Sequence, residues 1–98
     1  MAIKVERGSG NVFRDLGFSP DEAANLQLRS DLMIKLRRRV EARGERQAKA
    51  AQFLGVSQPR VSDLMRGRID RFSVDTLITL LGKLGVVVRV TLRAHRAA

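Results

Sequence analysis

Hydrophobic residues recur at every fourth position through a long polar stretch in the first half of the chain: Leu28, Leu32, Leu36 and Val40. This spacing places one apolar stripe along a helix. Ser19-Pro20 is typical of a helix start, and Gly44 is typical of a helix end. The pattern predicts a helix over residues 20–43, in which a second cap at Ser30-Asp31 would produce a break.

Shorter helical segments are predicted on both sides of this long helix. Before it, residues 11–16 are expected to form one turn, with three residues facing inward: Val12, Phe13 and Leu16. After it, residues 47–54 are expected to bury Ala48, Ala51, Phe53 and Leu54 and to end at Gly55. Two further helices are predicted, over residues 58–66 with Ser57 as its cap and over residues 74–84 with Ser73 as its cap.

The hydrophobic period changes to two near the C-terminus. Four apolar residues alternate there with Val87, Arg89, Thr91 and Arg93: Val86, Val88, Val90 and Leu92. This alternation, rich in β-branched residues, predicts a strand over residues 86–93. A strand needs a partner, because even a two-stranded hairpin is marginal in water. The candidates are the same strand of a second copy, the Ile3–Val5 segment, and the edge of a bound protein's sheet.

The chain has 98 residues, which is the length of one domain. We expect a flexible arm over residues 1–10 with a joint at Gly8-Gly10, a helical domain over 11–85, the strand over 86–93, and a frayed tail over 94–98. No apolar run approaches the roughly 18 residues of a membrane span, and the N-terminus lacks a signal-peptide core. There is no cysteine, so disulfides and thiolate metal sites are excluded, and a cytoplasmic location is expected.

The charge is unevenly distributed along the chain. The net charge is +9, from 19 Lys and Arg against 10 Asp and Glu. Residues 1–30 contain four basic and four acidic side chains, whereas residues 31–98 contain 15 basic and 6 acidic ones. A basic half beside a neutral half indicates a polyanionic partner. Composition alone does not distinguish DNA from RNA or anionic lipid.

Two short helices joined by a glycine turn describe a helix-turn-helix unit over residues 47–66. Ala51 is expected where the helices cross, Gly55 in the turn, and the apolar contacts at Val56, Val61 and Leu64. A plain helical hairpin is the alternative. The polar, capped second helix and the basic half favour DNA binding, with the N-terminal end of that helix in the major groove.

The side chains of this unit suit contacts with double-stranded DNA. Base readout is assigned to four residues of the second helix: Gln58, Arg60, Ser62 and Asp63. Contacts with the DNA backbone are assigned to a second set: Arg46, Gln47, Lys49, Ser57, Arg66, Arg68 and Arg71. Arg60 has an alternative role, which is to bind a phosphate, and Asp63 has one as well, which is to orient Arg60 or Arg66. Because such helices work in pairs on symmetric sites, a second copy is the favoured partner of the strand, through Val86, Val88, Val90 and Leu92.

The segment RQAKAAQFLGVSQPRVSDLMRGR (residues 46–68) resembles the helix-turn-helix of the Xre/Cro/phage-repressor superfamily. The flanking segments SGNVFRDLGFSPDEA and FSVDTLITLLGKLGVVVRV resemble small Xre-type regulators that include HigA-like antitoxins. The resemblance implies a mainly all-α, five-helix, lambda-repressor-like domain that binds an operator as a homodimer and represses transcription. In many relatives it also implies neutralisation of a RelE/HigB-type ribonuclease toxin. Arg46 departs from the Thr or Ser usual before the Gln of the first motif helix.

The sequence contains no arrangement typical of an enzyme. No nucleophile–base pair or Gly-rich phosphate loop is present, so no catalytic residue, cofactor or metal is expected. His95 has no companion ligands. The basic side chains of Lys35, Arg37, Arg38 and Arg39 point around a helix, and most of them are interpreted as a solvated face. Nonspecific RNA binding is disfavoured, because all four aromatic residues are Phe and are expected in the core.

Overall fold

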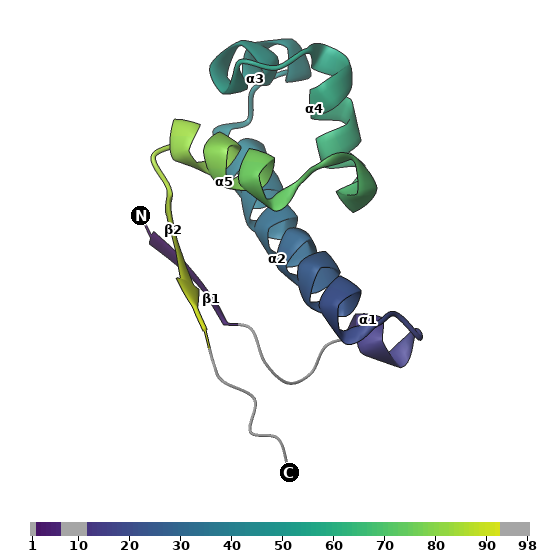
Figure 1. Cartoon of the computed structure of the whole chain (residues 1–98). Coiled ribbons are helices and arrows are strands. Elements are labelled where there is room, and N and C mark those ends of the chain that lie inside the picture. The colour runs from purple at the N-terminus through teal and green to yellow at the C-terminus, as the bar shows by residue number, and fades with distance from the viewer. Residues whose placement is uncertain (1, 7–11, 93–98) are drawn as a thin grey trace.

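The computed structural model of the chain describes residues 2–6 and 12–92 (Figure 1). In chain order, the elements are β1 (Ala2–Glu6), α1 (Val12–Asp15), α2 (Pro20–Arg43), α3 (Gln47–Leu54), α4 (Gln58–Met65), the 3₁₀ turn η1 (Ile69–Arg71), α5 (Val74–Lys83) and β2 (Val87–Thr91). The predicted mainly helical fold, with five helices and a short C-terminal strand, is confirmed. The expected joint at residues 8–10, the tail at 94–98 and His95 lie outside the described residues.

The long helix α2 is the central element of the fold, with α1 at one end and α3 and α4 at the other (Figure 1). Ser19 caps it, because its hydroxyl accepts a hydrogen bond from the backbone N–H of Glu22 at 3.3 Å, and Gly44 ends it with a φ of 64°. The break considered at Ser30-Asp31 does not occur. Asp31 instead accepts a hydrogen bond from the Gln27 amide at 3.0 Å, one turn earlier in the same helix.

The hydrophobic core forms where the apolar stripe of α2 packs against α4 and α5. Leu32 and Leu36 of α2 are fully buried in one cluster with residues of the later elements: Leu54, Val61, Leu64, Phe72, Leu77, Leu80 and Leu81. Helix α4 contributes only Val61 and Leu64 as buried residues. The core therefore holds α4 along one narrow side.

Several burial predictions for the short helices are wrong. In α3 the buried residues are Ala50, Ala51 and Leu54, whereas Ala48 is exposed. Phe53 is 44% exposed, and the guanidinium of Arg43 lies 3.5 Å from the centre of its ring. Helices this short show too few turns for their periodicity to define the buried side.

Three apolar residues near the N-terminus, Phe13, Leu16 and Phe18, also lie nearer the surface than predicted. Leu16, expected to face inward, is 68% exposed. Phe13 is half-buried and meets Phe18 edge to face, with ring centroids 6.0 Å apart. Of the four Phe residues only Phe72 is fully buried, so the expectation that all of them belong to the core is wrong.

The described strands form a two-stranded parallel sheet in which β1 pairs with β2 (Figure 1). The register places Ala2 opposite Val87 and Glu6 opposite Thr91. Residues 2–6, expected in a flexible arm, thus form a strand, and within the chain β2 pairs with the Ile3–Val5 segment, which is one of the three candidate partners. Val86 is buried and Val88 packs on the core, whereas Val90 and Leu92 are 41% and 76% exposed.

Two glycines provide a matched test of the left-handed turn between α3 and α4. Gly55 has a φ of +68° in the turn between α3 and α4, whereas Gly82 lies in α5 with open space where a Cβ would stand. We expect Gly55→Ala to lower the free energy of unfolding by about 1–2 kcal/mol, because Ala is strained in the left-handed region. Gly82→Ala is expected to raise it by roughly 0.5–1 kcal/mol through helix propensity. Urea unfolding measures both, and shifts of the same sign would contradict this account.

Candidate nucleic-acid interface

The turn between α3 and α4 sets the angle at which α4 leaves the core. The N–H of Gly55 donates to the Gln52 carbonyl at 3.3 Å, and that of Val56 donates to the Ala51 carbonyl at 3.0 Å. Ser57 then caps α4 by accepting a hydrogen bond from the Arg60 N–H at 3.3 Å. These bonds end one helix and start the next within a few residues, as the motif predicts.

One side of α4 is buried and the opposite side faces solvent. Successive residues of a helix are rotated by about 100°, so the buried Val61 and Leu64 place a different set on the opposite side: Pro59, Ser62, Asp63 and Arg66. Pro59, Arg66 and the leading residue Gln58 are exposed, and Ser62 and Asp63 are half-buried. Pro59 was missing from the predicted readout set. Helical period, applied from Val61, is the signal that identifies it.

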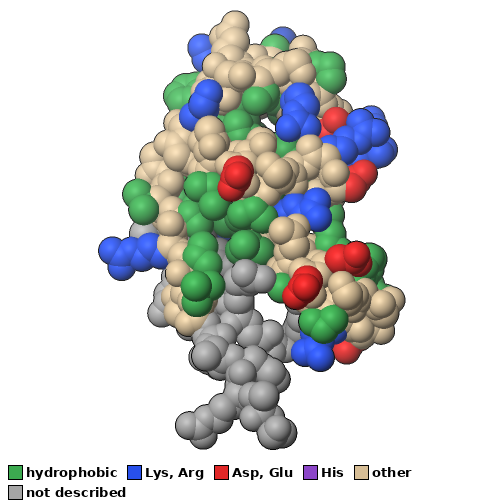
Figure 2. Space-filling view, viewed as in Figure 1, with side chains coloured by type: hydrophobic (Ala, Val, Ile, Leu, Met, Phe, Trp, Pro, Cys, Tyr) green, Lys and Arg blue, Asp and Glu red, His purple; other side chains and the backbone are tan. Residues whose placement is uncertain are grey.

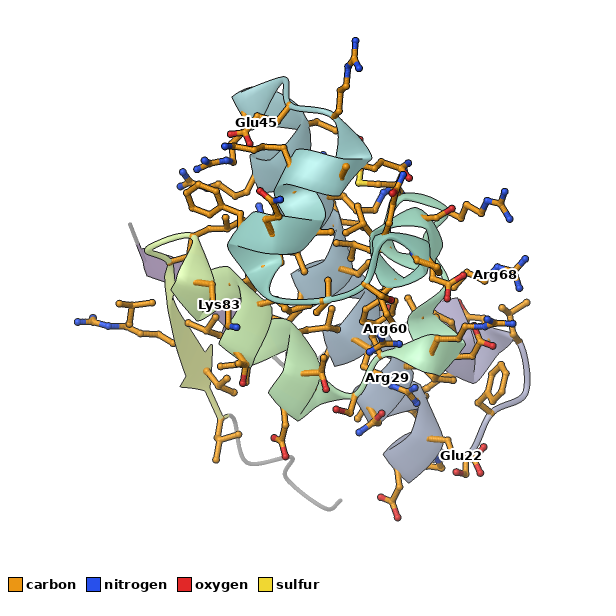
Figure 3. All side chains as sticks on the ribbon, turned by 90° about the horizontal axis from the view of Figure 1, so that it is seen from above. Glu22, Arg29, Glu45, Arg60, Arg68 and Lys83 are labelled. Carbon is orange, nitrogen blue, oxygen red and sulfur yellow. The ribbon has the colours of Figure 1, made fainter. Side chains whose placement is uncertain are left out.

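Arg60 is not part of the exposed side of α4. Its Nη1 donates a hydrogen bond to the Arg71 carbonyl at 2.7 Å, and its guanidinium carbon lies 4.1 Å from the centre of the Phe72 ring. Figure 3 shows Arg60 beside the segment that leads into α5. Since Arg60 is two residues after Gln58, it points about 200° away from it. The structure therefore places Arg60 against the protein, away from the side where its base-readout role was predicted.

Asp63 pairs with a cation that was not expected to be its partner. Its carboxylate accepts a hydrogen bond from Nη1 of Arg71 at 3.3 Å, whereas Arg60 or Arg66 was expected in that position. Arg71 thus binds α4 twice, through its carbonyl to Arg60 and through its side chain to Asp63. Arg29 of α2 adds a third link, from its Nη1 to the Ile69 carbonyl at 3.0 Å. These contacts attach η1 to both α4 and α2.

Polar and basic side chains predicted to contact the DNA backbone lie at the start of α3 and at both ends of α4. All of the other predicted backbone contacts are exposed: Arg46, Gln47, Lys49, Ser57, Arg66 and Arg68. Arg68 points away from the ribbon in Figure 3. Figure 2 shows most of the visible Lys and Arg side chains in the upper half, over α3, α4 and the segment after α4. Arg46 precedes α3 without a side-chain cap bond, which leaves the first N–H groups of α3 available to an anion.

Two cations near the motif were not predicted to take part in it. Nζ of Lys83 is so close to the α3–α4 turn that it would lie 2.6 Å from a Cβ placed on Gly55. Nη1 of Arg37 would lie 3.3 Å from a Cβ on Gly67, at the end of α4. Arg37 is half-buried, so it is not among the residues of this run that form the predicted solvated face. Both contacts join residues far apart in sequence, so no local pattern indicates them.

Comparison with known proteins agrees with this geometry. A family model described as a helix-turn-helix domain matches residues 12–93. A solved structure assigned to the XRE family of transcriptional regulators is 35% identical to this chain, with a TM-score of 0.70. The alignment covers 79% of this chain and 90% of that one. The chain belongs to the XRE family of helix-turn-helix proteins. No curated protein matches it.

Membership of the XRE family defines the general activity of the protein, which is DNA binding in transcriptional regulation. The exposed end of α4 and its basic surroundings are the part of the structure suited to that activity. Among the helices of the described residues, none combines the length and hydrophobicity that crossing a bilayer requires.

Arg60 and Gln58 are expected to differ in their effect on stability. Arg60→Ala removes a hydrogen bond and a cation–π contact, so we expect the free energy of unfolding to fall by about 1 kcal/mol. Gln58→Ala removes an exposed side chain and is expected to change it by less than about 0.5 kcal/mol. Urea unfolding of both variants checks this. Equal midpoints would show that Arg60 is not bound to the scaffold in solution.

Proposed function

We propose that this XRE-family protein is a repressor that binds a symmetric operator as a homodimer, with the N-terminal end of α4 in the major groove. The observation that supports this most directly is the exposed leading end of α4, together with exposed cations on the neighbouring segments: Arg46 and Lys49 at the start of α3, and Arg66 and Arg68 after α4. A duplex that approaches this end would meet phosphate-binding groups on both sides of a base-reading helix. Binding over a promoter would exclude the polymerase. The proposal places the protein in the cytoplasm, on the nucleoid when bound.

Within this proposal the residues divide into three roles. Gln58 and Ser62 contact base edges, Gln58 through an amide that matches the edge of adenine. Arg46, Gln47, Lys49, Ser57, Arg66 and Arg68 contact the sugar–phosphate backbone. Arg60, Asp63 and Arg71 hold α4 against η1, which supports the angle of the reading helix. The roles of Arg60, Asp63 and Arg71 differ from those predicted from sequence, because these side chains contact one another's segments and Phe72.

The proposed homodimer uses the exposed apolar side of β2. Val90 and Leu92 follow Val86 and Val88 at a spacing of two residues, so the four share one face of the strand. The inner two cover the core, whereas the outer two are exposed. The sheet has two strands in the described part of the chain, so one edge of β2 remains available there. A second copy would cover both the exposed side chains of Val90 and Leu92 and this free edge of β2.

A second candidate function is that of an antitoxin, which neutralises a RelE/HigB-type ribonuclease and regulates its own operon. The observation that favours it is a groove at the end of α2 away from α3 and α4 (Figure 1). Its lining has two carboxylates and one guanidinium, and consists of Phe18, Asp21, Glu22, Asn25, Leu26 and Arg29. It combines an exposed aromatic ring with two exposed carboxylates. Such a surface suits a basic protein that contributes an apolar anchor.

Operator binding is expected to depend steeply on salt. Each phosphate neutralised adds about −0.9 to the slope of log affinity against log salt concentration. Because the proposed homodimer carries two copies of Lys49, we expect Lys49→Ala to make the slope shallower by about 1.8. Arg14→Ala is the control, because Arg14 is exposed on α1, at the other end of α2 from the motif (Figure 1), and is expected to leave the slope unchanged. Identical slopes for wild type and Lys49→Ala would remove Lys49 from the interface.

An added carboxylate is expected to change the oligomeric state on one face of β2 and not on the other. Val90→Asp places a carboxylate on the proposed dimer face, and we expect it to yield a monomer with weaker operator binding. Val87→Asp is the matched control on the opposite face, where Val87 is 62% exposed, and it should remain a dimer. Sedimentation equilibrium measures the mass, and circular dichroism checks the helices. A monomeric wild type, or two dimeric variants, would overturn this assignment.

The antitoxin function is tested with a small basic nuclease encoded next to this gene. Co-expression of the two proteins should allow them to purify together, and Phe18→Asp should separate them by placing a charge in the groove. Ile34→Asp is the control, because Ile34 and Phe18 are both 41% exposed and Ile34 does not line the groove. Failure of the wild-type pair to co-purify, or equal behaviour of the two variants, would count against this function.

A further inference from the structure

Pro59 is an exposed apolar residue at the reading end of α4. It is the second residue of the helix, directly after Gln58 and on the side opposite Val61 and Leu64. Arg60, the next residue, is bound to Arg71 and Phe72. The first turn of α4 therefore presents one amide and one saturated ring to an approaching duplex.

We propose that Pro59 is a specificity-determining residue that contacts the C5-methyl group of a thymine beside the adenine read by Gln58. This inference rests on the proposed operator binding and specifies its sequence preference. The thymine methyl group is the one apolar feature that a base edge shows in the major groove. The ring of Pro59 has no hydrogen-bond donor or acceptor, so apolar contact is the only favourable contact it can make with a base.

The chemistry of Pro59 also disfavours the alternative base pairs. Cytosine presents an amino group at the position where thymine presents a carbonyl oxygen, next to its unmethylated C5 edge. A ring packed there would take water from that amino group without replacing its hydrogen bond, which costs free energy. Adjacent residues of a helix are separated by about 1.5 Å along the axis. Gln58 and Pro59 would therefore contact the same or neighbouring base pairs.

A structural role for Pro59 is the rival explanation. Proline is well suited to the first turn of a helix, because its φ is already helical and the missing N–H would have no partner there. That role explains a proline in this turn, but it predicts no dependence of binding on a DNA methyl group. The two explanations therefore differ in how the protein responds to thymine and uracil, which differ only in that methyl group.

The experiment begins with selection of bound sequences from a random duplex pool by the wild-type protein. Each thymine of the enriched site is then replaced by uracil, one position at a time, and affinity is measured by fluorescence anisotropy. Burial of one methyl group corresponds to roughly a fourfold change in affinity. We expect the wild type to lose about that factor at one thymine in each half-site. We expect Pro59→Ala, which lacks the Cγ and Cδ atoms of the ring, to lose most of this discrimination between the thymine and uracil duplexes.

Gln58→Ala is the matched control, since it alters the neighbouring exposed side chain and should keep the response to uracil. Urea unfolding of each variant confirms that the fold is intact. If the pool yields no enriched site, the proposed function fails together with this inference. If a site is enriched but Pro59→Ala responds to uracil as the wild type does, the operator-binding proposal stands and the assignment of Pro59 is overturned. Absence of any uracil-sensitive position in the wild type also overturns it.

Discussion

Burial of the apolar stripe of α2 is the interaction on which the rest of this structure depends. Leu32 and Leu36 form one cluster with Val61 and Leu64 of α4 and with Leu77 and Leu81 of α5. A shallow core is the expected result in a chain of 98 residues. Because α4 contributes only two fully buried residues, most of its surface is left outside the core. The same packing that stabilises the domain therefore leaves one side of α4, the helix proposed to read the operator, exposed to solvent.

The helices were predictable wherever a cap or a repeated stripe marks them. Ser19, Ser57 and Ser73 each accept a hydrogen bond from the N–H three residues later, as their position before a helical segment indicates. The burial pattern of α1 and α3 was not predictable, because one or two turns of helix give too little periodicity. The pairing of β1 with β2 was open among three partners for a related reason. It joins segments far apart in the chain, and no local signal encodes such a contact.

The candidate site was predictable as a surface but not in its internal contacts. The spacing of Ala51, Gly55, Val61 and Leu64 identifies the motif, and the exposure of Gln58, Lys49, Arg66 and Arg68 follows from it. Arg60 shows the limit of composition-based assignment, since an arginine near a recognition helix suits base readout whichever way it points. Its orientation is decided by Phe72 and the Arg71 carbonyl, which belong to a later segment. Pro59 has no hydrogen-bonding side-chain group, so residue chemistry did not indicate it, whereas the helical period places it on the exposed side of α4.

The parallel pairing of β1 with β2 has a consequence for how the protein is made. Synthesis runs from the N-terminus, so β1 leaves the ribosome well before its partner over Val87–Thr91 does. Helices α2 to α5, which contain nearly all of the core, are synthesised in the interval. Local helical contacts also form faster than pairings between distant segments. A nascent chain thus assembles its helical body first, and the emergence of β2 is the event that closes the sheet.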